Sequence, residues 1–240
     1  MHPEIILEHA DWVMINKPAG MLSIPDREGK EPSLKKWTEA TVGSAYTVDR
    51  LDQFTSGLIL FAKHPESQQE LSKLFEERKI DKRYLGLVKG TPIHAEDTID
   101  VPMMEHPAKN GKMVTHAKGK AALTTYKVIE AFPWMSLVEF NIHTGRTHQI
   151  RVHMQHIGHP IMCDELYGDG QPFLLSSLKK NYKVSLNQEA EIPMLNRQAL
   201  HAWKLSFTWK GNEISGEATL PKDMRATLQQ VRKRSQPSKR

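Results

Sequence analysis

Residues 47–63, TVDRLDQFTSGLILFAK, join charged and apolar side chains in a way that few folds accommodate. Asp49, Arg50 and Asp52 precede a Thr-Ser-Gly turn, which leads directly into the apolar run 58–61. The length and continuous apolar character of that run predict a buried strand. Burial of an unpaired carboxylate costs several kcal/mol, so such a group is usually paired or protonated. Asp52 therefore either caps the start of a strand at the surface or belongs to a functional site.

Patterns on either side of this stretch predict many short strands and few helices. Residues 4–20 indicate two strands around a turn, and 65–81 indicates a helix that begins at Pro65. Residues 147–158 predict a second helix that Gly158 ends. Further strands are expected at 83–90, 123–132, 135–143, 200–209 and 213–220. Because strands often follow one another directly, the pattern favours an α+β fold with a mixed, largely antiparallel sheet.

The rest of the sequence constrains the setting of this fold. Cys163 is the single cysteine, which rules out an internal disulfide and fits a reducing compartment. The first twenty residues lack the features of a signal peptide, and no apolar window is long enough for a membrane span. We expect a soluble cytoplasmic protein with one compact domain over 1–224 and a basic C-terminal tail over 225–240, either disordered or a fraying helix end.

Positive charge is concentrated in a few segments. The net charge is +5, yet without the last sixteen residues 27 basic and 28 acidic residues remain. Residues 78–89 hold five Lys or Arg against one Asp, and 109–127 hold five Lys and no acid. Such stripes suit a protein that binds a polyanion, because phosphate contacts dominate such affinities. Solvated loops are the alternative interpretation of each stripe taken alone.

Residues 143–168 contain five histidines and two arginines, with no acid before Asp164. The histidine spacings do not match the strong metal signatures, so we expect no metal site. Arg146 would lie at the start of the predicted helix, where backbone N–H groups bind anions. Asp52 has no Walker loop, GxGxxG or Ser-His-Asp pattern beside it, and no second carboxylate of the kind that glycoside hydrolysis requires. The residues alone leave a structural cap and a catalytic group equally open for Asp52.

Five ordered blocks resemble those of the RluA-type pseudouridine synthases, which isomerise uridine in ribosomal or transfer RNA. RLDQFTSGLILFAK (50–63) is similar to the family's HRLDxxTSGLLLxAK block. The others are NKPAGMLSIP (16–25), FEERKIDKRYLGLVKG (75–90), TGRTHQIRVHMQHIGHPIMCDELYG (144–168) and RQALHAWKLSF (197–207). Ordered blocks over most of a chain are far more specific than one motif. The resemblance implies the pseudouridine-synthase fold, with a bifurcated sheet, flanking helices and a central cleft.

By position, the resemblance implies that Asp52 is the catalytic nucleophile and that an ion pair with Arg151 keeps it charged. Arg50 would organise the flipped nucleotide, Tyr84 would stack on the target base, and Ile150 would pack against the uracil ring. An aromatic face offsets part of the stacking that an extruded uridine loses. The isomerisation needs no cofactor. Basic side chains expected to contact the RNA backbone are Lys79, Lys82, Arg83, Lys112, Lys118, Lys120 and Arg146.

Two positions depart from the family pattern. Asp49 stands where the family has His, and Cys163 stands where it has Gly. The carboxylate of Asp49 would add negative charge beside Asp52, which raises the pKa of a neighbouring acid or diverts Arg50. Because the first block begins within the first residues, we expect no S4-type RNA-binding domain before it.

These observations together predict an RNA pseudouridine synthase that acts as a monomer on ribosomal or transfer RNA. A non-catalytic RNA-binding or ribosome-assembly factor that uses the same cleft is the alternative, and a nucleoside-cleaving glycosylase is a further one. The sequence leaves open which uridine is modified, and whether Asp52 attacks ribose C1′ or uracil C6.

Overall fold

The computed structural model describes residues 2–109, 111–179, 182 and 190–235. The chain packs as two compact units, each assembled from separate stretches of sequence. The first unit contains residues 1–85, 140–147 and 200–219, and the second contains 86–139, 148–199 and 220–240. The boundary falls inside two strands, β5 (Asp81–Lys89) and β10 (Met135–Ile142). The sequence predicts one domain over 1–224 and does not anticipate this division into two units.

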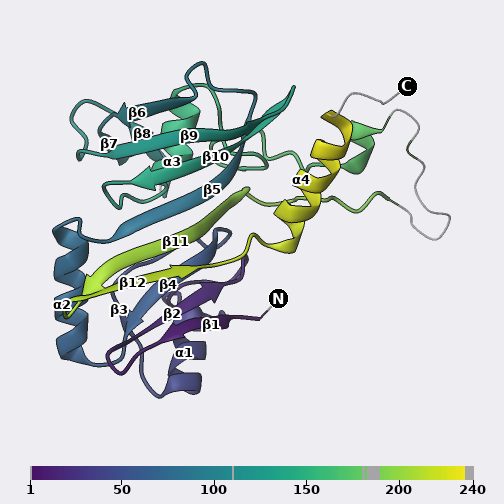
Figure 1. The fold of residues 1–240 in the computed structure, drawn as a ribbon. Helices are drawn as coiled ribbons and strands as arrows, with labels where there is room; N and C mark the ends of the chain where they lie inside the picture. The colour runs from purple at the N-terminus through teal and green to yellow at the C-terminus, as the bar shows by residue number, and fades with distance from the viewer. Residues whose placement is uncertain (1, 110, 180–181, 183–189, 236–240) are drawn as a thin grey trace. The chain divides into compact units, whose positions relative to one another are not determined.

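The first unit is built on a mixed sheet whose strands follow the order β1–β2–β4–β11, with β3 also on β4 and β12 on β11 (Figure 1). Its described pairings are antiparallel except that of β4 with β11, which is parallel. The strands are β1 (Glu4–Glu8), β2 (Trp12–Lys17), β3 (Tyr46–Thr47), β4 (Ser56–Ala62), β11 (Leu200–Trp209) and β12 (Asn212–Glu217).

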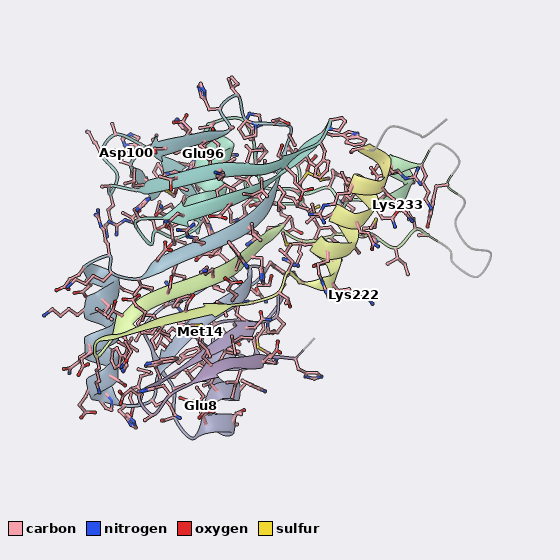
Figure 2. The ribbon with its side chains drawn as sticks, viewed as in Figure 1. Glu8, Met14, Glu96, Asp100, Lys222 and Lys233 are labelled. Atoms are coloured by element: carbon pink, nitrogen blue, oxygen red, sulfur yellow. The ribbon has the colours of Figure 1, made fainter. Side chains whose placement is uncertain are left out.

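Strand β4 lies at the centre of this unit's core. All seven of its residues are buried, which confirms the strand predicted from the apolar run. Apolar side chains of β2 and β11 pack into the same cluster as those of β4, and Met14 of β2 is fully buried there (Figure 2). Burial on both faces explains why the run is continuously apolar rather than alternating. The charged loop that precedes β4 therefore leads into a fully buried strand.

Two helices complete the first unit. Helix α2 (Pro65–Glu76) begins with the predicted Pro65 and buries Leu71 in the core cluster. Helix α1 (Leu34–Val42) was not predicted; it begins at the cap Ser33, whose side chain accepts a hydrogen bond from the Lys36 amide. It ends at Gly43, which has a φ of 89° and adopts the left-handed conformation that favours glycine.

The second unit contains a smaller set of strands around a buried helix. Strand β9 (Leu123–Ala131) pairs antiparallel with β6 (Glu96–Asp100), and β7 (Met103–Glu105) pairs antiparallel with β8 (Met113–Thr115). Helix α3 (Gln149–His156) buries six of its eight residues. A short 3₁₀ helix, η1, spans Leu175–Leu178. The observed elements make a mixed, mostly antiparallel α+β fold, as the sequence predicts.

The predicted basic tail, 225–240, is helical over residues 225–235. These residues, expected to be disordered or a fraying helix end, form most of helix α4 (Lys222–Ser235), whose first and last turns carry Lys222 and Lys233 (Figure 2). Met224, Leu228 and Val231 recur at helical spacing and are buried. Their apolar stripe, rather than the charges between them, decides the structure of this segment. The last predicted tail residues, 236–240, lie outside the described part of the chain. No helix among the described residues is long and apolar enough to cross a membrane.

Candidate active site

The loop between β3 and β4 carries Asp52, and hydrogen bonds hold the loop backbone around that residue. Ser23 Oγ donates to the Leu51 carbonyl at 2.7 Å and accepts from the Leu51 amide at 3.0 Å. The Thr55 amide donates to the Asp52 carbonyl at 3.1 Å and closes a turn directly before β4. Asp52 itself is partly exposed. A partly exposed carboxylate on a well-held loop is suited to meet a substrate in one orientation.

Lys17, from the NKPAGMLSIP block, fastens the other side of the same loop. Its side chain is fully buried at the end of β2, and Nζ donates to the carbonyls of Pro18 at 3.0 Å, Met21 at 2.8 Å and Gln53 at 2.8 Å. These charge-assisted hydrogen bonds offset part of the cost of burying an ammonium group. Lys17 therefore supports the residue after Asp52, a role that sequence analysis missed.

Strand β5 adds two buried side chains to this region of the first unit. Lys82 and Tyr84 are two residues apart, so they share one face of the strand, and both are buried. Lys82 forms an ion pair with Asp49. Burial raises the pKa of Tyr84; Lys82 opposes that rise, and the carboxylates of Asp49 and Asp52 add to it. The structure therefore brings the predicted residues Asp52 and Tyr84 into one electrostatic cluster.

The burial of Lys82 corrects its predicted contact with the RNA backbone. Its residue is only 4% exposed, because strand alternation turns the side chain inward. The ion pair also bears on Asp49, whose carboxylate was expected to add negative charge beside Asp52. In the structure this carboxylate is paired with the ammonium of Lys82. Arg50 is exposed on the same loop, one residue from Asp49.

The other predicted RNA contacts differ in their exposure. Lys79 bonds to Glu77 at 2.7 Å, and Arg83 Nε lies 2.9 Å from Asp81 Oδ2. In the second unit, Lys112 Nζ lies 5.6 Å from the ring centre of Tyr167. The exposed residues are Lys79, Lys118 and Lys120, and the partly buried ones are Arg83, Lys112 and Arg146.

Arg151 is held by Asp164 inside the second unit. Its Nε donates to Oδ2 at 2.6 Å and its Nη2 donates to Oδ1 at 2.9 Å, and both side chains are buried. The Tyr167 ring lies 4.9 Å from the guanidinium carbon. Backbone amides of Leu166 and Tyr167 also donate to Asp164 Oδ1. Sequence analysis missed Asp164 as a partner, although it is the first acid in the histidine-rich segment.

The predicted ion pair between Asp52 and Arg151 joins residues of different units and stays a prediction. Ile150, next to Arg151 on α3, is 4% exposed. The predicted central cleft and the stacking of Tyr84 on a base likewise stay predictions.

His153 and Cys163 of the second unit form hydrogen bonds within the protein. His153 lies 3.0 Å from Thr124 Oγ1 and 3.0 Å from the Val101 carbonyl, and burial lowers its pKa. Burial raises the pKa of the Cys163 thiol to about 11. Among the residues that the structure describes, no group of three or more His, Cys, Asp or Glu side chains could hold a metal ion.

Comparison with known proteins identifies the family. The family described as RNA pseudouridylate synthase matches residues 11–156, which is more than half of the chain. The chain belongs to this family, and it is an RNA pseudouridine synthase, an isomerase that converts uridine in RNA to pseudouridine. The resemblance seen in the sequence blocks is thereby confirmed.

Individual relatives refine this picture. Ribosomal large subunit pseudouridine synthase D of Buchnera aphidicola (subsp. Schizaphis graminum) is 35% identical over 236 residues, covering 95% of this chain and 73% of the relative. The protein of the same description from Escherichia coli K12 is 32% identical over 237 residues, covering 95% and 70%. The solved structure of human RNA pseudouridylate synthase domain containing 4 has a TM-score of 0.74 and 25% identity, covering 95% of this chain and 92% of that one.

Proposed function

We propose that Asp52 is the nucleophile of this RNA pseudouridine synthase. The observation that carries the proposal is the position of its partly exposed carboxylate. Asp52 lies on a loop in which the residues before and after it are held by hydrogen bonds to Ser23 and Lys17. The influence of the Asp52 charge on Tyr84 adds support, because Tyr84 is the proposed stacking partner of the uracil. A nucleophile and a base-binding ring within one cluster can act on the same nucleotide.

The chemistry is an isomerisation that balances without a co-reactant. Asp52 attacks either ribose C1′ or uracil C6, and the bond between N1 and C1′ breaks. The uracil rotates, a bond forms between C5 and C1′, the proton leaves C5 and N1 gains one. Release of Asp52 returns the enzyme to its starting state, so no oxidant, reductant or metal is consumed.

Residues of both units are proposed to support this step. Arg151 would keep Asp52 ionised, Ile150 would contact the uracil and Arg50 would hold the flipped nucleotide. The bidentate grip of Asp164 on Arg151 supports the first role because it orients a guanidinium that carries five donors. A positioned cation favours the charged form of a carboxylate.

We propose ribosomal RNA of the large subunit as the substrate, with the enzyme acting as a monomer in the cytoplasm. The names of the Buchnera and Escherichia relatives support that substrate, and transfer RNA is the alternative. Exposed lysines such as Lys118 and Lys120 would contact the RNA backbone without reading its sequence.

Release of tritium from RNA labelled at uracil C5 tests the nucleophile. The variant Asp52→Asn keeps the shape of the side chain and should lose activity by on the order of a thousandfold or more. Asp26→Asn is the matched control, since Asp26 is an exposed acid in the same unit and should leave tritium release unchanged. Tritium release by Asp52→Asn at the wild-type rate would remove Asp52 from the mechanism.

Mapping of pseudouridines tests the substrate. RNA from a strain that lacks this protein should lose pseudouridine at one or more positions of large-subunit ribosomal RNA relative to its parent. Loss confined to transfer RNA would move the proposal to that substrate. Unchanged pseudouridine in every RNA, together with defective ribosome assembly, would favour the non-catalytic factor.

A further inference from the structure

Strand β5 turns a lysine and a tyrosine toward the loop that carries Asp52. Along residues 81–86 of β5, buried and partly buried positions alternate, so Lys82 and Tyr84 lie on the buried face while Asp81 and Arg83 lie on the other. The Lys82 ammonium lies 5.5 Å from the centre of the Tyr84 ring, within the range of a cation–π interaction. A single cation thus lies beside the ring proposed to meet the uracil.

The counter-charge for this ammonium comes from Asp49. The Lys82 side chain is 5% exposed and that of Asp49 is 17% exposed, so water screens their ion pair weakly. Burial acts to lower the pKa of Lys82, but the carboxylate of Asp49 and the Tyr84 hydroxyl outweigh it and hold that pKa above its ordinary value. The groups that face the ammonium are Asp49 from the loop and Tyr84 from the strand, and the charge of Asp52 also acts on Tyr84.

We propose that Asp49 and Lys82 form a positioning pair for catalysis by the nucleophile, in which the carboxylate of Asp49 holds the buried ammonium and the ammonium holds the ring of Tyr84 in place for the uracil. The proposal rests on the assignment of Asp52 as that nucleophile. It gives a role to the acid that departs from the family pattern described in the sequence analysis. Neither side chain needs to touch the substrate, since both act through the placement of Tyr84.

The proposal predicts a dependence of kcat on pH that a purely structural ion pair would not produce. When Asp49 is present, Lys82 stays protonated through the neutral and mildly alkaline range. When Asp49 loses its charge, burial dominates, and the pKa of Lys82 falls below its ordinary value. A neutral amine does not attract the Tyr84 ring as a cation does, so the ring is held less firmly.

The test measures kcat for pseudouridine formation from about pH 6 to about pH 10, a range that spans the expected fall in the lysine pKa. In Asp49→Asn, kcat should decrease by at least about tenfold across this range relative to wild type, through a new alkaline limb. KM should change little, because the pair does not bind RNA directly. Lys82→Met should be slower at every pH with no such limb, and the double variant should also lack the limb.

Folding stability provides a readout that does not depend on activity. A buried lysine whose folded-state pKa is lowered costs stability where it must be protonated, and that cost declines as pH rises from the lowered pKa toward the ordinary pKa of the unfolded chain. Asp49→Asn should therefore gain urea resistance relative to wild type as pH rises over the same range. Stability and kcat of this variant should move in opposite directions, whereas a variant that is merely misfolded would lose both.

A second ion pair, which is partly buried, supplies the matched control. Asp223 grips Arg197 in the second unit, with Nε to Oδ2 at 2.7 Å and Nη2 to Oδ1 at 3.0 Å. Arginine does not deprotonate in this range, so Asp223→Asn should lower stability without adding an alkaline limb. The proposal fails if the pH profile of Asp49→Asn superimposes on that of wild type, or if Asp223→Asn acquires the same limb. Retained activity of Asp52→Asn would instead overturn the nucleophile assignment and leave the ionisation of Lys82 to be judged by the stability curve.

Discussion

Arg151 and Asp164 share two hydrogen bonds, from Nε to Oδ2 at 2.6 Å and from Nη2 to Oδ1 at 2.9 Å, in the interior of the second unit. The carboxylate also caps the turn that follows it, since the amides of Leu166 and Tyr167 donate to Oδ1. Asp164 therefore fixes both the position of the arginine and the path of the backbone beyond α3. The arginine proposed to serve Asp52 is thus itself held by a second acid.

Removal of the Asp164 charge should destabilise the protein and impair catalysis together. Asp164→Asn leaves the buried guanidinium without its anion, and loss of one partner of a buried pair costs about 3–5 kcal/mol. Urea denaturation at neutral pH measures the loss, and tritium release measures activity. Glu213→Gln is a suitable control, since Glu213 is an exposed acid on β12. Equal stability of Asp164→Asn and wild type would contradict this account of the pair.

Local sequence patterns predicted most elements of the fold because the apolar positions in those elements are also the buried ones. The apolar run in β4 is buried along its whole length, and helix α2 begins at the predicted Pro65. Prediction from sequence patterns failed where one feature of the sequence obscured another. In α4, the buried Met224, Leu228 and Val231 stand among arginines and lysines, and the charges suggested a tail. Helix α1 is short, with Leu34 and Thr38 as its buried residues, so its apolar stripe was too narrow to notice.

The proposed site likewise contains residues that the sequence predicted and contacts that it could not predict. Asp52 and Tyr84 were predicted as site residues from blocks of sequence; both lie in the first unit, where the charge of Asp52 adds to the rise in the pKa of Tyr84 that burial causes. The pairing of Asp49 with Lys82 could not be predicted, because 33 positions separate them and only the packing of β5 against the loop joins them. The same limit applies to Lys17, whose three acceptors are backbone carbonyls that any residue type can supply.

Gly57 should tolerate no side chain. It lies at the start of β4 with a φ of 110°, and a Cβ there would overlap the backbone of Ala202 on the parallel strand β11. Gly57→Ala should therefore cost about 3 kcal/mol or more, or prevent folding, because backbone must move to admit the methyl group. Thermal denaturation measures the effect.

Gly211 provides the control for that substitution. It has a similar φ of 85°, but a Cβ there would meet nothing within 4 Å. Gly211→Ala should cost about 1–2 kcal/mol, the strain of the left-handed conformation alone. Equal losses for the two variants would show that strain, and not the contact with Ala202, accounts for Gly57.

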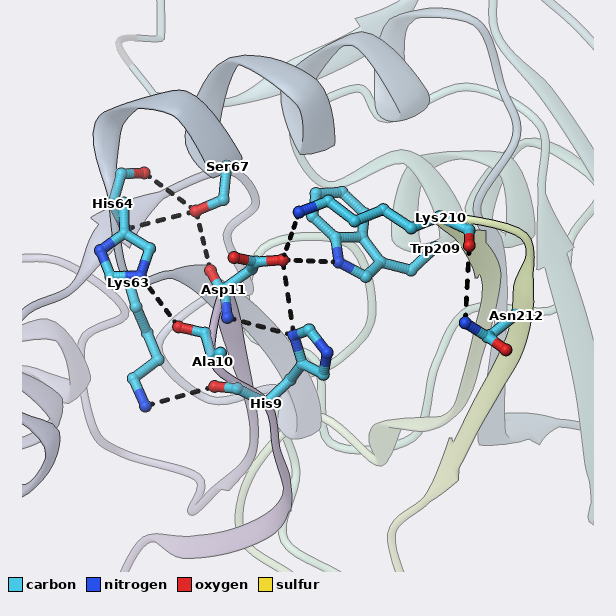
Figure 3. A network of polar contacts seen from close by, with 9 residues as sticks. All are labelled: His9, Ala10, Asp11, Lys63, His64, Ser67, Trp209, Lys210 and Asn212. Atoms are coloured by element: carbon cyan, nitrogen blue, oxygen red, sulfur yellow. Dashed lines mark hydrogen bonds and ion pairs between the residues drawn. The ribbon is translucent and has the colours of Figure 1, made fainter.

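Asp11 should make the first unit sensitive to acid. Its carboxylate accepts hydrogen bonds from Trp209 Nε1 at 3.0 Å and Lys210 Nζ at 2.8 Å, while its backbone carbonyl accepts one from Ser67 Oγ at 2.8 Å. Figure 3 shows this network. The hydrogen bonds from Lys210 and Trp209 lower the pKa of Asp11 below its ordinary value. A lowered carboxyl pKa stabilises the fold above the unfolded value, and this contribution is lost as pH falls through the folded value.

Asp11→Asn should accordingly be about 1 kcal/mol less stable than wild type at neutral pH, a small loss because solvent screens the pair with Lys210. The difference should shrink as pH falls below about 4 toward the lowered pKa of the wild-type carboxyl, where that carboxyl also becomes neutral. Urea denaturation at both pH values measures it. Glu8→Gln, which alters an exposed acid bound to Lys63, is the control, and a difference that grows on acidification would contradict the assignment.

Lys118 and Lys120 should contribute to RNA affinity without contributing to specificity. Both are exposed in a segment with no acidic residue, so each can reach a phosphate. Replacement of each by Gln should weaken binding to cognate and unrelated RNA alike, and should reduce the slope of log K against log salt by about 0.7–0.9 per lost contact. Filter binding at several salt concentrations measures both. Lys73→Gln, at an exposed lysine paired with Glu77 on α2, should leave the slope unchanged, and a loss restricted to one RNA sequence would assign these lysines to base recognition instead.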